Sequence, residues 1–264
     1  RETQKDNPFV WFALGQLHSR LGNHDLAIQH YKVAITLKPD FGSAHRFMGN
    51  AYQDLRRYSE AIEAFKKAIG INPKDALAYR LMGVVYQDLR RYSEAIEAYE
   101  KAIALKPDYA EAYRYMGFAY GFMKRYPEAI EAFKKAIAID PNDVYSYTAL
   151  GRAYADVNRY AEAIAAINTA IAIDPNDVYS YTALGRAYQE LKRYSEAIEA
   201  YEKAITIDPN DAWPYAAVAR VYADVNRYAE AIAAYQQSLR LKPTGLIADS
   251  VREELARLRR LAGQ

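Results

Sequence analysis

Residues 76–109 read ALAYRLMGVVYQDLRRYSEAIEAYEKAIALKPDY, and near-copies of this 34-residue stretch fill most of the chain. Proline recurs once in every copy, at residues 39, 73, 107, 141, 175, 209 and 243. A strict period of this size indicates a stack of like supersecondary units, each packing mainly on its neighbours. We therefore expect one array of repeats, although 264 residues would ordinarily suggest one or two globular domains.

Each copy carries the pattern of two helices joined by a turn. In the quoted copy, Tyr79, Gly83 and Tyr86 lie at i, i+4 and i+7, on one face of a helix. Residues 92–103 repeat this spacing and predict a second helix. The preceding helix must end near the Asn-Pro-Lys-Asp segment, because proline lacks the backbone donor that continues a helix. Asp75 then caps the next helix.

Small residues recur where two helices must approach closely. One repeat position is glycine in six copies and alanine in the seventh, at residues 15, 49, 83, 117, 151, 185 and 219. Large rings stand on the facing helix, at Tyr31, Phe65, Tyr99, Phe133, Tyr201 and Tyr235. Glycine inside a helix costs about 1 kcal/mol relative to alanine, so we expect it where a ring needs the room.

The first copy reads W-x2-L-G-x2-H from residue 11 and A-x3-Y from residue 27, and it ends near Pro39. This pattern and its period resemble the tetratricopeptide repeat. The resemblance implies an all-α solenoid, a right-handed superhelix of antiparallel helical hairpins. It divides the chain into an N-terminal segment 1–7, repeats over 8–245 and a C-terminal capping helix over 246–264. Seven repeats start at residues 8, 42, 76, 110, 144, 178 and 212.

The ends and the turns depart from this pattern. Ile247, Val251, Leu255 and Leu258 form one apolar stripe, which is typical of a helix that caps a stack. The turn between the helices carries Gly22 in the first copy but Arg, Lys or Asn in the others. Arginine and lysine adopt a left-handed conformation less readily than asparagine or glycine.

Residues 136–154 and 170–188 are identical, which favours a recently amplified or a designed array. The polar start without methionine indicates a trimmed or excised domain.

Composition excludes several classes of function. The 35 basic and 33 acidic residues nearly cancel, so no whole-chain field attracts nucleic acid. The chain has no cysteine, and no apolar run long enough to span a membrane. We find no catalytic motif or phosphate-binding loop, and no two of the four histidines lie at i, i+4. We expect no enzyme, cofactor or metal site, and a cytoplasmic location.

In the family that the chain resembles, repeat positions 2, 5, 9, 12 and 13 line a groove formed by the first helices. Carried over to this chain, these positions supply the candidate groove residues. They are Arg46, Asn50, Leu77, Arg80, Val84, Arg114, Phe118, Phe122, Tyr145, Arg152, Tyr179, Arg186, Trp213 and Arg220. Arginine side chains suit a carboxylate or a phosphate, because the guanidinium offers a bidentate fork.

The arginines divide into two sets. Arg152, Arg186 and Arg220 each have an acid four residues later, and such pairs neutralise one another along a helix. Position five of repeats two to four is arginine without such an acid, at Arg46, Arg80 and Arg114. These three are the better ligand candidates and predict an acidic partner. Arg46 and Asn50 also match the first pair of the family's carboxylate clamp, but the other clamp positions do not match.

Apolar residues give a second hypothesis. Gly121 removes a side chain between Val84 and the pair Phe118 and Phe122, which predicts an apolar notch for a ligand beside the arginines. The alternative is that both rings pack between neighbouring helices. We expect a protein-interaction scaffold that binds an extended or helical segment of a partner. Two alternatives are a scaffold that self-associates into homo-oligomers, and the regulatory or substrate-binding arm of a larger enzyme.

Overall fold

The computed structural model describes residues 6–261 and 263, without the side chains of residues 246 and 247. Every regular element in these residues is a helix, so the prediction of an all-α fold is confirmed. The chain divides into an N-terminal unit that ends at Ile139 and a C-terminal unit that begins at Asp140. Most of the predicted segment 1–7 lies outside the described residues.

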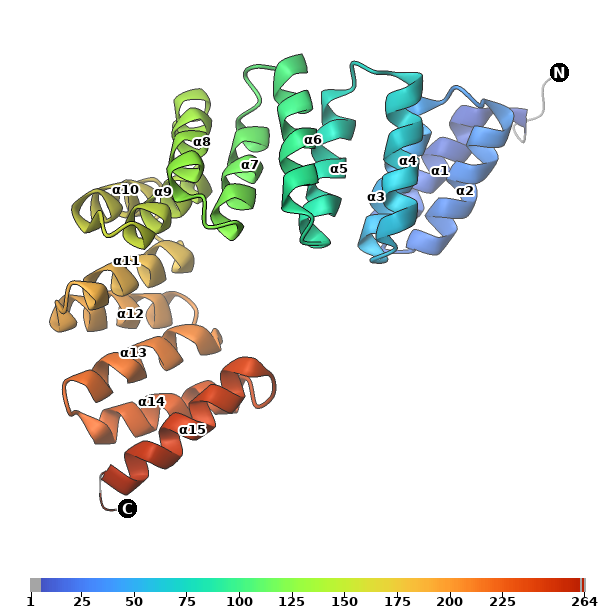
Figure 1. Cartoon of the computed structure of the whole chain (residues 1–264). Helices are drawn as coiled ribbons and strands as arrows, with labels where there is room; N and C mark the ends of the chain where they lie inside the picture. The colour runs from blue at the N-terminus through green and yellow to red at the C-terminus, as the bar shows by residue number, and fades with distance from the viewer. Residues whose placement is uncertain (1–5, 262, 264) are drawn as a thin grey trace. The chain divides into compact units, whose positions relative to one another are not determined.

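Four helical hairpins make up the N-terminal unit (Figure 1). Their helices are α1 (Pro8–Arg20), α2 (His24–Leu37), α3 (Gly42–Asp54), α4 (Tyr58–Ile71), α5 (Ala76–Asp88), α6 (Tyr92–Leu105), α7 (Ala110–Phe122) and α8 (Tyr126–Ile139). Each odd-numbered helix packs against the even-numbered helix that follows it, and each hairpin packs against the next within the unit. The described part of this unit is thus a series of antiparallel hairpins.

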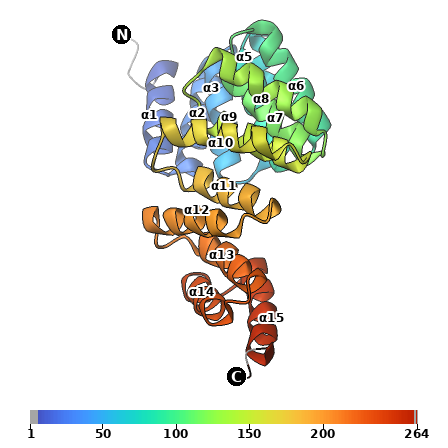
Figure 2. The ribbon, with the colours of Figure 1, turned by 90° about the vertical axis from the view of Figure 1, so that its left-hand side faces the viewer.

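The C-terminal unit, taken by itself, is also built of helical hairpins, followed by one more helix (Figure 2). Its helices are α9 (Val144–Asp156), α10 (Tyr160–Ile173), α11 (Val178–Glu190), α12 (Tyr194–Ile207), α13 (Ala212–Asp224), α14 (Tyr228–Leu241) and α15 (Leu246–Leu261). The last helix buries Val251, Leu255 and Leu258 against the hairpin of α13 and α14. The side chain of Ile247, also placed in this stripe, lies outside the described residues.

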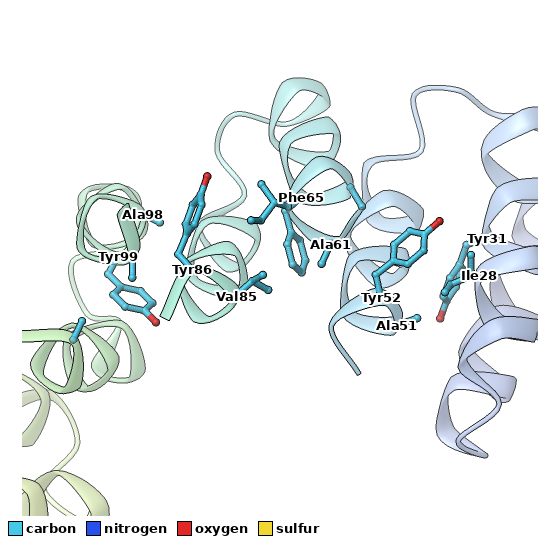
Figure 3. Close-up of a cluster of buried hydrophobic side chains, with 14 of the residues drawn as sticks. Ile28, Tyr31, Ala51, Tyr52, Ala61, Phe65, Val85, Tyr86, Ala98 and Tyr99 are labelled. Atoms are coloured by element: carbon cyan, nitrogen blue, oxygen red, sulfur yellow. The ribbon is translucent and has the colours of Figure 1, made fainter. Parts of the chain in front are cut away.

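The core of the N-terminal unit lies between successive hairpins (Figure 3). Tyr31 of α2 is fully buried beside α3, where Tyr52 joins the same cluster. Phe65 of α4 is likewise fully buried, and it shares the cluster with Val85 and Tyr86 of α5. Each second helix is therefore covered by the first helix of the next hairpin.

Glycine permits the close approach of the two helices in a hairpin, as expected. A Cβ atom built on Gly83 would lie 2.5 Å from the Tyr99 ring, and one built on Gly117 would lie 2.7 Å from the Phe133 ring. Real Cβ atoms essentially never approach another heavy atom within 3.0 Å, so the rings occupy the space of the missing methyl group. In the fifth hairpin Ile167 takes the place of the ring and approaches Gly151 in the same way.

All hairpin turns adopt one left-handed conformation, whatever residue they carry. The residues at this position in the second to seventh hairpins have φ between 57° and 60°. Gly22 has φ 76° at the same place. The following amide closes the turn, because Arg91 N donates to Tyr86 O at 2.8 Å. Arg and Lys are thus held in a conformation that costs them about 1 kcal/mol or more.

Candidate functional site

One pocket of about 380 Å³ gathers four of the predicted groove residues in the C-terminal unit. Arg152 of α9, Tyr179 and Arg186 of α11, and Trp213 of α13 all line it. Thr182, Ala183 and Asp211 complete the lining. The pocket is therefore formed by three successive first helices, which are the helices that the family pattern predicts to carry a groove.

Two exposed rings stand at this pocket. The side chains of Tyr179 and Trp213 occupy the second position of their helices, and they are 70% and 42% exposed. Trp213 leans edge-on against the buried ring of Tyr201, with ring centroids 6.3 Å apart. Burial raises the pKa of Tyr201 far above its ordinary value, against the opposing pull of the Arg186 and Arg220 charges. Tyr201 is therefore neutral, and arginine and aspartate set the charge of the pocket.

The arginines of the pocket do not pair along their own helices as the sequence suggested. Arg186 donates to Asp156 of the preceding first helix at 2.8 Å, so Asp156 is engaged by the next hairpin. Arg152, four residues before Asp156, is exposed and has no hydrogen-bond or ion-pair partner among the residues described. The interpretation of Arg152 and Asp156 as a pair within the helix is wrong.

In the N-terminal unit, two of the arginines that were expected to have no acidic partner are paired with one. Arg80 donates to the Tyr109 hydroxyl at 2.6 Å and lies 3.4 Å from Glu111, both contributed by the next hairpin. Arg46 donates to Asp75 at 3.1 Å. Both arginine side chains are largely buried. The inference that these arginines are unpaired is therefore wrong, because their acids lie across the hairpin interface rather than four residues later.

The difference between the two units comes from repeat position five. In the second to fourth hairpins this residue is arginine, and the Arg80 side chain reaches across to the start of the next first helix. In the C-terminal unit it is the short Thr182, whose hydroxyl donates back to the carbonyl of Val178 at 2.9 Å. Threonine leaves open the space that arginine fills. The pocket in the C-terminal unit follows from this substitution.

A buried polar chain holds two of the first helices together beside the pocket. Thr148 Oγ1 and Ser180 Oγ lie 2.6 Å apart, and Ser180 Oγ also donates to Asp177 at 2.5 Å. Ser180 is fully buried. The bond between Thr148 and Ser180 joins α9 to α11, which carry Arg152 and Tyr179, and the bond to Asp177 holds Ser180 at the start of α11.

Phe118 and Phe122 contact different helices. Phe118 packs edge-on against the core ring of Phe133 in α8, at a centroid distance of 5.2 Å. Phe122 is 61% exposed and stacks on Tyr92 of α6 at 5.3 Å. A Cβ atom on Gly121 would meet nothing within 4 Å. Phe122 is thus not a core residue, and the ligand notch at Gly121 stays a prediction.

The remaining predicted residues are scattered. Leu77, Val84 and Arg114 are partly buried in the N-terminal unit, whereas Tyr145 and Arg220 are exposed in the C-terminal unit. Asn50 has a buried Oδ1 atom with no hydrogen-bond partner among the described residues. Their binding roles stay predictions.

Sequence reasoning missed Thr182, Ala183 and Asp211 as lining residues. Asp211 caps α13, where its carboxylate accepts from Trp213 N at 2.9 Å. The available signal was the change from arginine to threonine or alanine at position five, which separates the repeats into two kinds. Among the described residues, no three metal-ligating side chains cluster. None of the helices described is both long and apolar enough to cross a lipid bilayer.

Models of known protein families match most of the chain. The family model for the cilia and flagella-associated protein 70 C-terminal domain matches residues 1–207, and a tetratricopeptide repeat model matches residues 188–251. The chain belongs to the tetratricopeptide repeat family. Membership identifies the chain as a scaffold for protein–protein interaction. No curated protein matches the chain in sequence.

Solved structures of tetratricopeptide repeat proteins share the fold. The crystal structure of MamA is 30% identical with a TM-score of 0.58, over 61% of this chain and 94% of MamA. A tetratricopeptide repeat protein from Parabacteroides merdae is 16% identical with a TM-score of 0.76, over 95% of this chain and 98% of that one. YrrB, described as having an unusual peptide-binding site, is 22% identical with a TM-score of 0.53, over 73% of this chain and 99% of YrrB.

Proposed function

We propose that the first-helix pocket of the C-terminal unit binds an extended or helical segment of a partner protein. The partner places a carboxylate at Arg152 and a bulky apolar side chain against Tyr179 and Trp213. The observation that carries this proposal is an arginine without an internal partner beside two exposed rings, in one pocket of three first helices.

The chemistry of the pocket favours this ligand. Exposed aromatic residues next to arginine are typical of residues that dominate binding energy at interfaces. Asp156 already neutralises Arg186, whereas the charge of Arg152 is not offset by a direct contact. Asp211 contributes one negative charge to the lining, but its Oδ1 atom accepts from the backbone of α13. An acidic ligand therefore gains the most binding energy from contact with Arg152.

The charge at position five explains why we place the site in the C-terminal unit. Arg80 is largely buried and its Nε atom already contacts Tyr109 and Glu111, so a ligand would have to compete with these two residues. Breaking such contacts costs binding energy before any new contact forms. This moves the acidic-partner hypothesis from Arg46, Arg80 and Arg114 to Arg152.

Trp213 can report on binding directly. The chain has two tryptophans, so a Trp11→Phe background leaves Trp213 as the single tryptophan, which can be excited selectively at 295 nm or longer wavelengths. We would titrate this protein with four synthetic peptides of equal length. They combine phenylalanine with glutamate, phenylalanine with glutamine, phenylalanine with lysine, and alanine with glutamate. The first should bind most tightly, and binding should weaken with salt because exposed charges are screened over about 8–10 Å.

Two variants test the location. Arg152→Gln should weaken the phenylalanine–glutamate peptide about three- to tenfold and leave the glutamine peptide unchanged. Thr182→Arg should block all the peptides by filling the pocket as Arg80 does in the N-terminal unit. Arg240→Gln is the control, because it removes the same charge from an exposed position on α14 that does not line the pocket. Equal binding of the lysine and glutamate peptides, or full binding to folded Thr182→Arg, would refute the proposal.

The two alternative functions have their own tests. Sedimentation equilibrium over a range of protein concentrations separates a monomeric scaffold from a homo-oligomer. The full reading frame around the chain decides whether it is the arm of a larger enzyme. The absence of catalysis by this chain stays a prediction.

A further inference from the structure

A second kind of cavity recurs within single hairpins, between the two helices of each. In the hairpin of α7 and α8 it measures about 380 Å³ and is lined by Tyr113, Met116 and Tyr120 on one side and Ala132 on the other. The same repeat positions line cavities of about 340 Å³ between α3 and α4 and about 560 Å³ between α11 and α12. We call these three cavities the hairpin grooves.

The first hairpin has the same arrangement of helices, but its own side chain occupies the corresponding space. His30 of α2 stands at the repeat position that is Ala64, Ala132 and Ala200 in the three hairpin grooves. Its imidazole lies between two rings of α1. The centroid of His18 is 5.0 Å away and that of Trp11 is 5.5 Å away.

The environment of His30 defines what such a groove accepts. The His18 and His30 rings are stacked at 27°, so the space takes a planar group between two flat walls. Burial, and then the charge of His18, lower the pKa of His30, so its ring is neutral near pH 7. In the three hairpin grooves, the residues at repeat positions 4 and 11 form the walls, as Tyr113 and Tyr120 do between α7 and α8. The alanine at position 23, such as Ala132, leaves the space between these walls empty.

We propose that the three hairpin grooves each bind an aromatic side chain of a partner polypeptide, in the manner in which the first hairpin holds His30. This surface is separate from the first-helix pocket, since it is formed by the first and second helices of one hairpin. The proposal does not depend on the function proposed above.

Charges at the rim of each groove are largely paired within the protein. The groove of α7 and α8 is bordered by Glu128, Glu131 and Lys135, but Arg125 pairs with Glu128 at 2.7 Å and Lys134 pairs with Glu131 at 3.0 Å. The groove of α3 and α4 has two glutamates and one lysine at the same positions, and that of α11 and α12 has three glutamates and one lysine. Arginine or lysine pairs with Glu60, Glu63 and Glu196 in the same way, so the three rims share no unpaired charge of one sign. The planar ring, rather than a charge beside it, is therefore the common requirement of the three grooves.

Methionine methyl groups can test the grooves one at a time. Met48 and Met116 line two of them, whereas Met123 lies at a turn and lines neither. We would label the methionine methyl groups with ¹³C and titrate the full chain with tryptamine, indole and indole-3-acetate. These three probes share the indole ring, and they carry a positive charge, no charge and a negative charge. We expect saturable shifts at Met48 and Met116 and none of comparable size at Met123. The three probes should bind with affinities within about twofold of one another, because the rim charges are largely paired.

A pair of opposite substitutions tests the grooves: one closes the groove of α7 and α8, and the other opens the groove of the first hairpin. Ala132→His should abolish the shift at Met116 and retain that at Met48, which also shows that the variant is folded. In the first hairpin, Leu14 stands at the repeat position of Met116, so Leu14→Met places a reporter there. This reporter should respond to tryptamine only when His30→Ala is added.

Three results would overturn the proposal. One is a Met116 shift that persists in folded Ala132→His. Another is no response at Leu14→Met after His30 is replaced by alanine, which remains decisive if Ala132→His fails to fold. The third is a Met123 shift as large as those at Met48 and Met116, which would mean that the ring binds without regard to the grooves.

Discussion

Two glycines of helix α7 should respond in opposite ways to the same substitution. Gly117 faces the Phe133 ring, and three atoms of that ring lie 2.7, 2.8 and 2.9 Å from the position of an added Cβ atom. Gly121 lies one turn later on α7, and an added Cβ atom there would meet nothing within 4 Å. Replacing each by alanine therefore separates crowding from intrinsic helix propensity within one helix.

The expected magnitudes follow from two opposing effects. Alanine is favoured over glycine inside a helix by about 1 kcal/mol at either position. At Gly117 the Phe133 ring must move by the better part of an ångström, although it is buried and packed edge-on against Phe118. Overpacking of this kind costs about 2–3 kcal/mol. We expect Gly117→Ala to lower the free energy of unfolding by about 1–2 kcal/mol, and Gly121→Ala to raise it by about 0.5–1 kcal/mol.

Urea unfolding followed by far-UV circular dichroism measures both changes against the unmodified chain. The slope of the transition must be compared as well, because repeat arrays can lose cooperativity and the two-state treatment then fails. The reasoning is refuted if Gly117→Ala is as stable as the parent protein, or if Gly121→Ala is less stable.

Three further predictions concern the turns, the buried polar chain and pH. Lys124 has φ 58°, so Lys124→Gly should raise the free energy of unfolding by about 0.5–1 kcal/mol in urea. Ser180→Ala should lower it by about 1–3 kcal/mol, because the buried Thr148 hydroxyl loses a partner at 2.6 Å. Burial lowers the pKa of His30 and His45 below the ordinary 6.5, so the unfolded chain takes up protons first. The free energy of unfolding should therefore fall as the pH drops below about 6.5, and it should fall less steeply in the variant that carries both His30→Ala and His45→Ala. A free energy of unfolding that is independent of pH between 7 and 5 would contradict this.

Local features of the fold were predictable because they depend on neighbours close in sequence. The turn after Asp88, the cap at Asp75 and the approach of Tyr99 to Gly83 all appear where the repeat pattern predicts them. A helix face is defined by residues three or four apart, and a cap acts within one turn. Such interactions recur with every copy of the repeat, so seven near-copies reinforce one prediction.

Pairing between hairpins could not be predicted in the same way. Arg46 finds its acid 29 residues later, and Arg186 finds its acid 30 residues earlier. Spacing along one helix suggested no partner for Arg46 and the wrong one for Arg186. Long side chains reach whichever partner the packing of two helices brings near, and this depends on helix positions and rotamers that a periodic pattern does not specify.

The sequence by itself determined the repeat, its helices and the small residues that let them pack, since these follow from local periodicity and steric size. Only the tertiary structure decided that Arg80 is paired within the protein while Arg152 is not, and that Phe122 is exposed and stacks on Tyr92. It also decided that the His30 ring fills the groove between the two helices of the first hairpin. The physical reason is that a binding surface depends on the space left between side chains from different helices. One residue at position five or position twenty-three opens or closes that space without altering the repeat.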